Sequence, residues 1–169
     1  MMRRLICLCL ALPCLAAAAD LSDIAWLEGE WQGYSGMGER TNLNHKTFAF
    51  EQAGKYLVER TISMFPVEGE PTVEYETHQD MAVFYAIGGA LRAKSFFVEG
   101  FVQSSTVTVE EDGARVVIES TEVEGGPPGM RARLIYRRAA DDRMTGTFEL
   151  DWSGEGYAPA GRFEFKRVR

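Results

Sequence analysis

The chain has 169 residues, of which 46% are hydrophobic, 11% aromatic and 25% charged. Its 18 basic and 25 acidic residues give a formal net charge of −7, so nucleic acid and anionic membrane surfaces are poor partners for it. A chain of this length can form one domain that is stabilised by its own hydrophobic core.

The amino-terminal segment has the pattern of a secretory signal peptide. Arg3 and Arg4 supply positive charge, the stretch up to Leu15 is an apolar core too short to span a membrane, and four alanines typical of a cleavage site follow. We therefore expect a signal peptide at 1–19 and a mature domain at 20–169. This predicts a periplasmic or secreted protein that is not inserted into a membrane.

All three cysteines, Cys7, Cys9 and Cys14, lie inside this expected signal segment. The mature chain should therefore have no disulfide, no thiolate metal site and no cysteine nucleophile. A lipoprotein signal with lipidation at Cys14 is the competing interpretation, and Pro13 disfavours it because a small residue is normally required there. Without the two arginines of the signal segment, 16 basic residues remain against 25 acidic ones, a net charge of −9.

The mature chain begins with a short helical pattern and continues as strands. Ser22 and Asp23 give a helix-start signal for one or two turns over 21–27. After them, segments rich in β-branched and aromatic residues are separated by turn residues such as Gly88-Gly89 and Asp112-Gly113, which favour tight antiparallel hairpins. The predicted strands are 29–36, 46–52, 55–64, 73–87, 90–98, 101–110, 114–123, 130–138, 143–152 and 160–168.

About ten sequential antiparallel strands predict an all-β, up-and-down β-barrel, because closure of the meander removes its exposed edges. Alternation assigns the faces: Met144, Phe148 and Leu150 are apolar, whereas Thr147 and Glu149 between them are polar. A barrel of this size that is lined partly by small residues should leave room for one small ligand.

The opening of the first predicted strand has a distinctive pattern, Trp26-Leu27-x-Gly29-x-Trp31-x-Gly33. Glycine permits a sharp turn from helix to strand, and a cation from the last strand can lie across the Trp31 ring and bind nearby carbonyls. This pattern resembles the calycin superfamily, which includes the lipocalins and fatty-acid-binding proteins. The resemblance implies a lipocalin-like barrel in which Gly29, Trp31 and Arg167 are structural.

Within that superfamily the opening is most similar to nitrobindin-like haem-binding β-barrels and to a related bacterial family of unknown function. This resemblance implies a haem-dependent activity on reactive nitrogen or oxygen species. Those barrels ligate iron through a histidine near the start of the last strand, and residues 157–162 contain none. Haem would need a replacement ligand, for which His78 and Tyr85 are the candidates.

The residues expected to bind a ligand are aromatic side chains of the barrel interior, with Arg60 as a possible anchor for a ligand carboxylate. Arg60 shares a strand face with the apolar Val58 and Ile62. The alternative is that Glu59 and Arg60 form an exposed pair and that the face of Leu57 points inward. The aromatic lining is predicted to be Phe48, Phe50, Phe97, Tyr136, Phe148 and Trp152.

His45 and His78 are the only histidines of the chain. His45 is predicted to face solvent, whereas His78 lies between Glu76 and Asp80 in a polar rim segment, where carboxylates would raise its pKa. Two separated histidines without cysteine supply too few ligands for a metal site, and no nucleophile elbow is present. We therefore expect no metal, no cofactor and no catalytic residue.

The leading hypothesis from the sequence is an exported barrel that carries a small apolar or amphipathic molecule, rather than an enzyme. One alternative is a haem-binding barrel. Another is a filled barrel that acts through its outer surface in a partner complex. The oligomeric state stays open.

Overall fold

The computed structural model describes residues 19–37, 40–66 and 75–168. The expected signal peptide, apart from Ala19, lies outside these described residues, as do the three cysteines. Among the residues that the structure describes, no helix combines the length and the apolar character needed to cross a bilayer.

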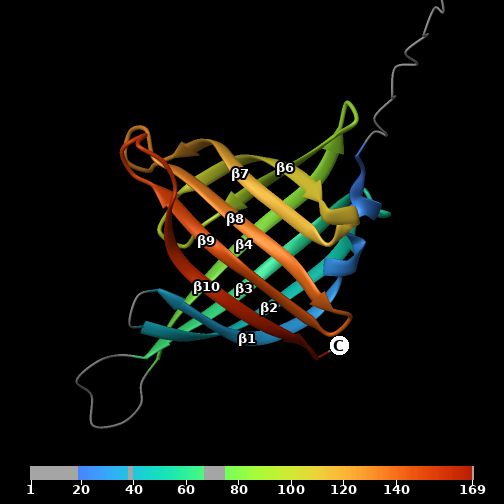
Figure 1. Cartoon of the computed structure of the whole chain (residues 1–169), viewed down its shortest axis with the longest axis horizontal. Coiled ribbons are helices and arrows are strands. Elements are labelled where there is room, and N and C mark those ends of the chain that lie inside the picture. The colour runs from blue at the N-terminus through green and yellow to red at the C-terminus, as the bar shows by residue number, and fades with distance from the viewer. Residues whose placement is uncertain (1–18, 38–39, 67–74, 169) are drawn as a thin grey trace, which may run out of the picture.

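Ten antiparallel strands in sequential order form a closed barrel, as predicted, and β1 pairs with β10 to complete it (Figure 1). The predicted strand 46–52 is shorter than the observed β2, which begins at residue 40. The prediction missed its first half because the residues there are mostly polar. The elements are η1 (Leu21–Leu27), β1 (Gly29–Met37), β2 (Arg40–Glu51), β3 (Tyr56–Pro66), β4 (Tyr75–Ile87), β5 (Ala90–Phe96), β6 (Val102–Glu110), η2 (Glu111–Gly113), β7 (Arg115–Glu124), β8 (Arg131–Ala140), β9 (Arg143–Asp151) and β10 (Ala158–Arg167).

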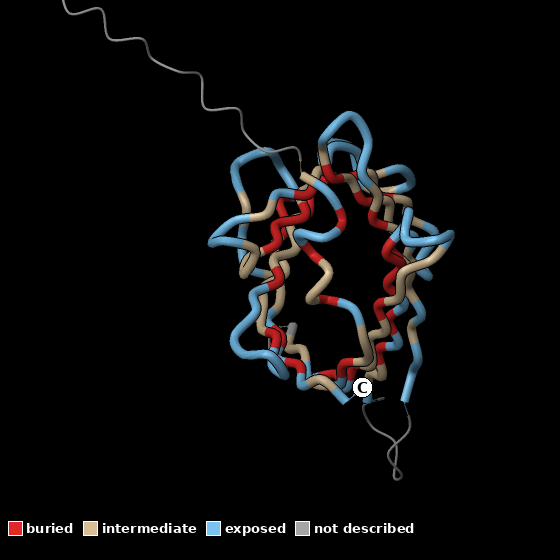
Figure 2. The backbone as a smooth tube through the Cα atoms, turned by 90° about the vertical axis from the view of Figure 1, so that its right-hand side faces the viewer, coloured by how far each residue is buried: buried red, intermediate tan, exposed pale blue. Residues whose placement is uncertain are grey.

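The short helix η1 covers one end of the barrel, which we call the closed end. Figure 2 looks onto this end and shows the backbone of η1 running across the ring of strands. Asp20 caps the helix, since its carboxylate accepts a hydrogen bond from the Ser22 N–H at 2.7 Å. The helix buries its own side chains Leu21, Ile24 and Leu27. The opposite end, where β1 leads into β2 and β9 leads into β10, is the open end.

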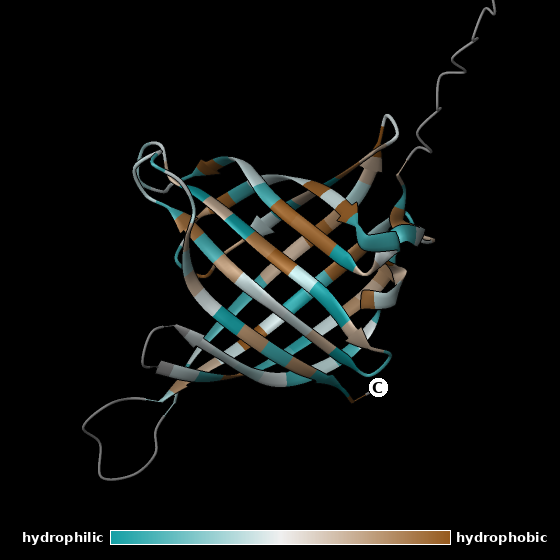
Figure 3. Cartoon of the chain, viewed as in Figure 1, coloured by the Kyte–Doolittle hydropathy of each residue, from teal (hydrophilic) through white to brown (hydrophobic). Residues whose placement is uncertain are grey.

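Residue alternation along the strands sorts side chains to the inside and outside of the barrel. Figure 3 shows hydrophobic and hydrophilic residues following one another along most strands. On β10, Phe163 and Phe165 are buried, whereas Glu164 and Lys166 between them are exposed. The side chains of this strand therefore alternate between the interior and solvent.

Aromatic side chains fill the interior near the closed end. The ring of Phe48 lies 6.5 Å from that of Phe84 and 5.8 Å from that of Tyr136, and Phe163 lies 5.4 Å from Tyr136 and 5.2 Å from Phe165. We call these five residues the aromatic plug. Edge and tilted contacts of this kind add stability beyond the burial of the rings.

Trp31 and Arg167 fasten η1 to the barrel. The Trp31 indole is fully buried and donates a hydrogen bond to the Leu27 carbonyl at 2.8 Å, while the Arg167 guanidinium lies over its ring at 4.2 Å. Arg167 also donates to the carbonyls of Trp26 and Glu28. These contacts satisfy carbonyls at the end of a helix, which agrees with a structural role.

Candidate functional site

A buried ionic group crosses the barrel directly above the aromatic plug. Glu59, with 6% of its side chain exposed, accepts hydrogen bonds from the Lys46 ammonium and, at 2.9 Å each, from the Thr61 and Tyr136 hydroxyls. Since Tyr136 belongs to β8 and Glu59 to β3, the contact joins opposite walls. We call Lys46, Glu59, Thr61 and Tyr136 the ionic floor.

The chemistry of the ionic floor keeps its phenol protonated. Burial raises the pKa of the Tyr136 phenol well above its usual range, and the neighbouring Glu59 charge raises it further. The phenol is therefore a permanent donor to Glu59. Lys46 in turn donates to the Thr61 hydroxyl at 2.8 Å and lies 5.7 Å from the centre of the Tyr136 ring.

A second polar layer lies closer to the open end. The Asn44 amide donates to the Ser35 hydroxyl at 2.8 Å and to the Asn42 carbonyl at 3.0 Å, and the Ser63 hydroxyl donates to Asn44 Oδ1 at 2.6 Å. Asn42 is 2% exposed, yet its side-chain oxygen Oδ1 accepts no hydrogen bond from the residues that the structure describes. An unsatisfied buried acceptor is costly, so this oxygen is available to a donor from a bound molecule.

His78 lies on the inward face of β4 at the open end. Its Nε2 is 3.1 Å from a Glu76 oxygen and its Nδ1 is 3.1 Å from a Glu99 oxygen. The pKa of His78 is raised from its ordinary value, chiefly by the hydrogen bond to Glu76, against a smaller opposing effect of burial. The ring also packs on Phe65, with 4.7 Å between centroids, so the imidazole is held on three sides.

Asp80 is half-buried, and it lies one inward position deeper on β4 than His78. Its Oδ1 accepts the backbone N–H of Val98 at 3.0 Å. Loss of water raises the pKa of the Asp80 carboxyl from its usual value, and the Val98 N–H and the Lys46 charge offset only part of that effect.

The wall opposite these polar residues is apolar. Leu134 of β8 pairs with Phe148 of β9, and Phe148 pairs with Gly161 of β10. Both side chains face the interior by alternation, but both are only half-buried. Inward side chains that keep exposed surface indicate that the interior is not completely filled at their level. We call the inward-facing residues above the ionic floor, Asn42, Asn44, Ser63, Asp80, Leu134 and Phe148, the polar chamber.

The expected anchor Arg60 is outside the barrel, which corrects its assignment to the interior. Its guanidinium bonds to a Glu51 oxygen at 2.9 Å, and 54% of its side chain is exposed. The alternative face is the inner one, since Leu57, Glu59 and Thr61 are all buried. The Glu59 and Arg60 pair does not form either, because successive residues of a strand point to opposite sides.

The other residues that the sequence predicted to bind a ligand lie in different parts of the structure. Phe48 and Tyr136 belong to the packed plug and ionic floor, Phe148 lines the polar chamber and His78 stands at its mouth. Phe97 is half-buried in the turn after β5. Trp152 is 58% exposed beyond the end of β9, so it does not line the interior.

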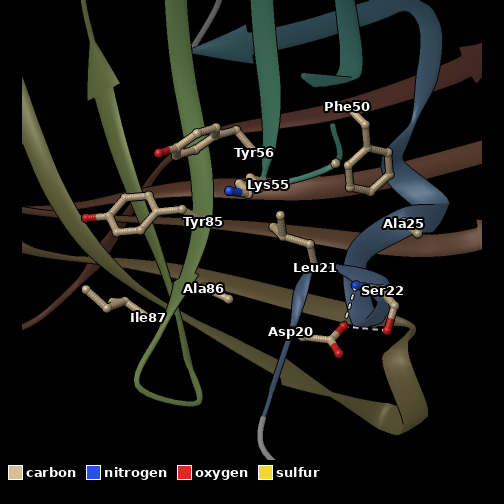
Figure 4. Close-up of a pocket in the computed structure, with 11 residues that line it drawn as sticks. Asp20, Leu21, Ser22, Ala25, Phe50, Lys55, Tyr56, Tyr85, Ala86 and Ile87 are labelled. Atoms are coloured by element: carbon tan, nitrogen blue, oxygen red, sulfur yellow. Dashed lines mark hydrogen bonds between the residues drawn. The ribbon is translucent and has the colours of Figure 1, made fainter. Parts of the chain in front are cut away.

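Phe50 and Tyr85 lie at a different place, a surface groove of about 760 Å³ beside η1. Figure 4 shows them with Leu21, Tyr56 and Lys55 between the amino-terminal segment and the ends of β3 and β4. Tyr85 faces outward, since it pairs with the exposed Tyr56. The structure does not bring this groove together with the polar chamber.

Neither residue expected to replace the haem histidine is placed to ligate iron inside the barrel. Both ring nitrogens of His78 are engaged by carboxylates, and Tyr85 is on the outer face. The arrangement of these two residues therefore does not fit haem. Within the described ranges, no group of three or more His, Asp, Glu or Cys residues is placed to hold a metal ion.

Sequence reasoning missed most of the polar chamber. Asn42, Asn44 and Lys46 continue the two-residue spacing of Phe48 and Phe50, which was the available signal that they share the inward face. These three residues are polar, whereas inward positions are usually predicted from apolar residues, so the spacing was not read as an inward face.

A solved structure with a similar fold is that of Rv2717c from M. tuberculosis. It matches with a TM-score of 0.65 and 15% sequence identity, over 92% of this chain and 99% of that chain. At this identity the likeness shows the barrel fold alone. No protein-family model matches this chain, and a search of curated proteins gave no match.

Proposed function

We propose that the protein binds one small amphipathic molecule in the polar chamber, entered from the open end. One observation carries this proposal: Leu134 and Phe148 face the interior of a closed barrel but keep exposed surface, opposite a buried polar wall. An apolar wall facing a polar wall suits a molecule with one apolar and one polar side.

The filled part of the interior limits the space that a ligand can occupy. The aromatic plug and the ionic floor occupy the closed half, so the open half is the part of the interior that is left for a ligand. The proposal thus modifies the sequence hypothesis, since Phe48 and Tyr136 support the site from below and do not line it. With the amino-terminal signal pattern, we also propose that binding takes place in the periplasm or outside the cell.

The test is a titration with Nile red, a neutral amphipathic dye whose emission reports an apolar environment. We expect saturable binding of one dye per protein. Ser95→Trp should block it, because Ser95 faces inward near the open end of β5, where it pairs with the buried Gln103. Lys94→Trp is the matched control, since Lys94 faces outward and pairs with Glu124 at 3.4 Å.

Both variants must first show a cooperative urea transition, so that loss of binding is not loss of the fold. Equal binding by Ser95→Trp and Lys94→Trp would mean that the dye binds elsewhere, and the proposal would be wrong. Native mass spectrometry of protein purified from its own host would then identify the natural ligand by its mass.

A further inference from the structure

We infer that the polar chamber selects a ligand with a protonated amine, a primary or secondary ammonium, over one with a carboxylate. This inference rests on the proposed function, because it assigns the head group of the molecule bound there. Two independent features carry it: the charges that face the chamber and the buried oxygen of Asn42.

Among the described residues, acidic groups outnumber basic ones at the chamber, its floor and its mouth. Asp80 lines the chamber, Glu59 lies in the floor beside Lys46, and Glu76 and Glu99 flank His78 at the mouth, so four carboxylates accompany one ammonium and one imidazole. The ammonium of Lys46 is bound to Glu59, so its charge is already compensated. With the imidazole protonated, two negative charges remain, and a ligand carboxylate would add a third at short range.

Asp80 is the group best placed to receive a cation. Its carboxyl has lost part of its water without gaining an ion-pair partner among the described residues, and one backbone N–H is the hydrogen bond it accepts there. Burying a carboxylate in this way is unfavourable until a cation compensates it. A ligand ammonium would supply that cation, with hydrogen bonds that are stronger than neutral ones.

Asn42 adds a requirement for N–H groups. Its Oδ1 is a buried acceptor without a partner in the described part of the chain, and Asn42 lies one inward position closer to the mouth than Asn44. An ammonium with N–H groups satisfies such an acceptor, whereas a quaternary ammonium of the same charge cannot. The two features together therefore favour a primary or secondary ammonium over a quaternary ammonium.

The experiment compares four probes with the same octyl chain, by isothermal titration calorimetry at neutral pH: octylammonium, octyltrimethylammonium, 1-octanol and octanoate. We expect octylammonium to bind about tenfold tighter than octanoate, and also tighter than octyltrimethylammonium. If octanoate binds as tightly as octylammonium, the inference is wrong while the proposed function stands. If none of the four binds, the proposed function fails.

Two variants locate the selectivity. Asp80→Asn should reduce the affinity for octylammonium several-fold and that for 1-octanol much less, whereas Asp141→Asn changes the net charge equally at an exposed position outside the chamber. Asn42→Leu should remove the preference for octylammonium over octyltrimethylammonium. Equal losses in the two aspartate variants would show that the selectivity comes from overall charge and would overturn the inference. Urea midpoints confirm that each variant is folded.

Discussion

The contacts of the ionic floor predict a large loss of stability when Lys46 is replaced. Lys46→Met removes the cation beside the Glu59 carboxylate, which has 6% of its side chain exposed and keeps the Thr61 and Tyr136 hydroxyls as donors among the described residues. Leaving one member of a buried ion pair alone costs about 3–5 kcal/mol. Because two donors remain, we expect a loss of about 3 kcal/mol in the free energy of unfolding, measured by urea denaturation with tryptophan fluorescence.

A second variant separates the unpaired charge from the loss of packing. Lys46→Met with Glu59→Gln keeps an acceptor for both hydroxyls but has no charge, so most of the lost free energy should return. Arg60→Met is the outer control, since its exposed pair with Glu51 is worth less than about 1 kcal/mol. The reasoning is refuted if Lys46→Met costs no more than Arg60→Met, or if the double variant is no more stable than Lys46→Met alone.

Three further predictions concern other parts of the barrel. The pKa of His78 is raised above its ordinary 6.5, so its stabilising effect is full below that value and is lost as pH rises through the raised pKa. The unfolding free energy of the wild type should therefore fall relative to His78→Asn as pH rises above 6.5 and through the raised pKa, and a constant difference would count against the two carboxylate contacts. Arg167→Leu should cost about 2 kcal/mol, since it removes the cation over Trp31 and contacts to three backbone carbonyls, and greater susceptibility of the amino-terminal helix to proteolysis should accompany that loss. Gly146→Ala should cost at least about 3 kcal/mol, because a Cβ would lie 2.2 Å from a Phe163 ring carbon and 1.9 Å from a backbone oxygen, and a urea midpoint equal to wild type would contradict this.

The fold could be predicted from the sequence because its signals are local. Gly88 and Gly89 both adopt positive φ, 59° and 75°, in the hairpin between β4 and β5, which is the backbone that the glycine pair indicated. Alternation of residue types supplied the faces of β9. Closure followed from the number of sequential strands, and the pairing of β1 with β10 confirms it.

The site could not be predicted as well because it depends on contacts between distant strands. Glu59 and Tyr136 are 77 residues apart, and no local pattern indicates that their side chains meet across the interior. Arg60 was assigned inward because its neighbours Val58 and Ile62 are apolar. On the outer face of this barrel Val58 is nonetheless buried, so apolar character alone did not identify the inner face of β3.

The location of binding is the central claim, and backbone NMR of the protein titrated with 1-octanol tests it most directly. The account predicts shift changes at Asn44, Ser63 and Phe148, in the open half of the barrel, with little change around the aromatic plug. Changes confined to the surface groove at Tyr56 and Tyr85, or no saturable change anywhere, would contradict it.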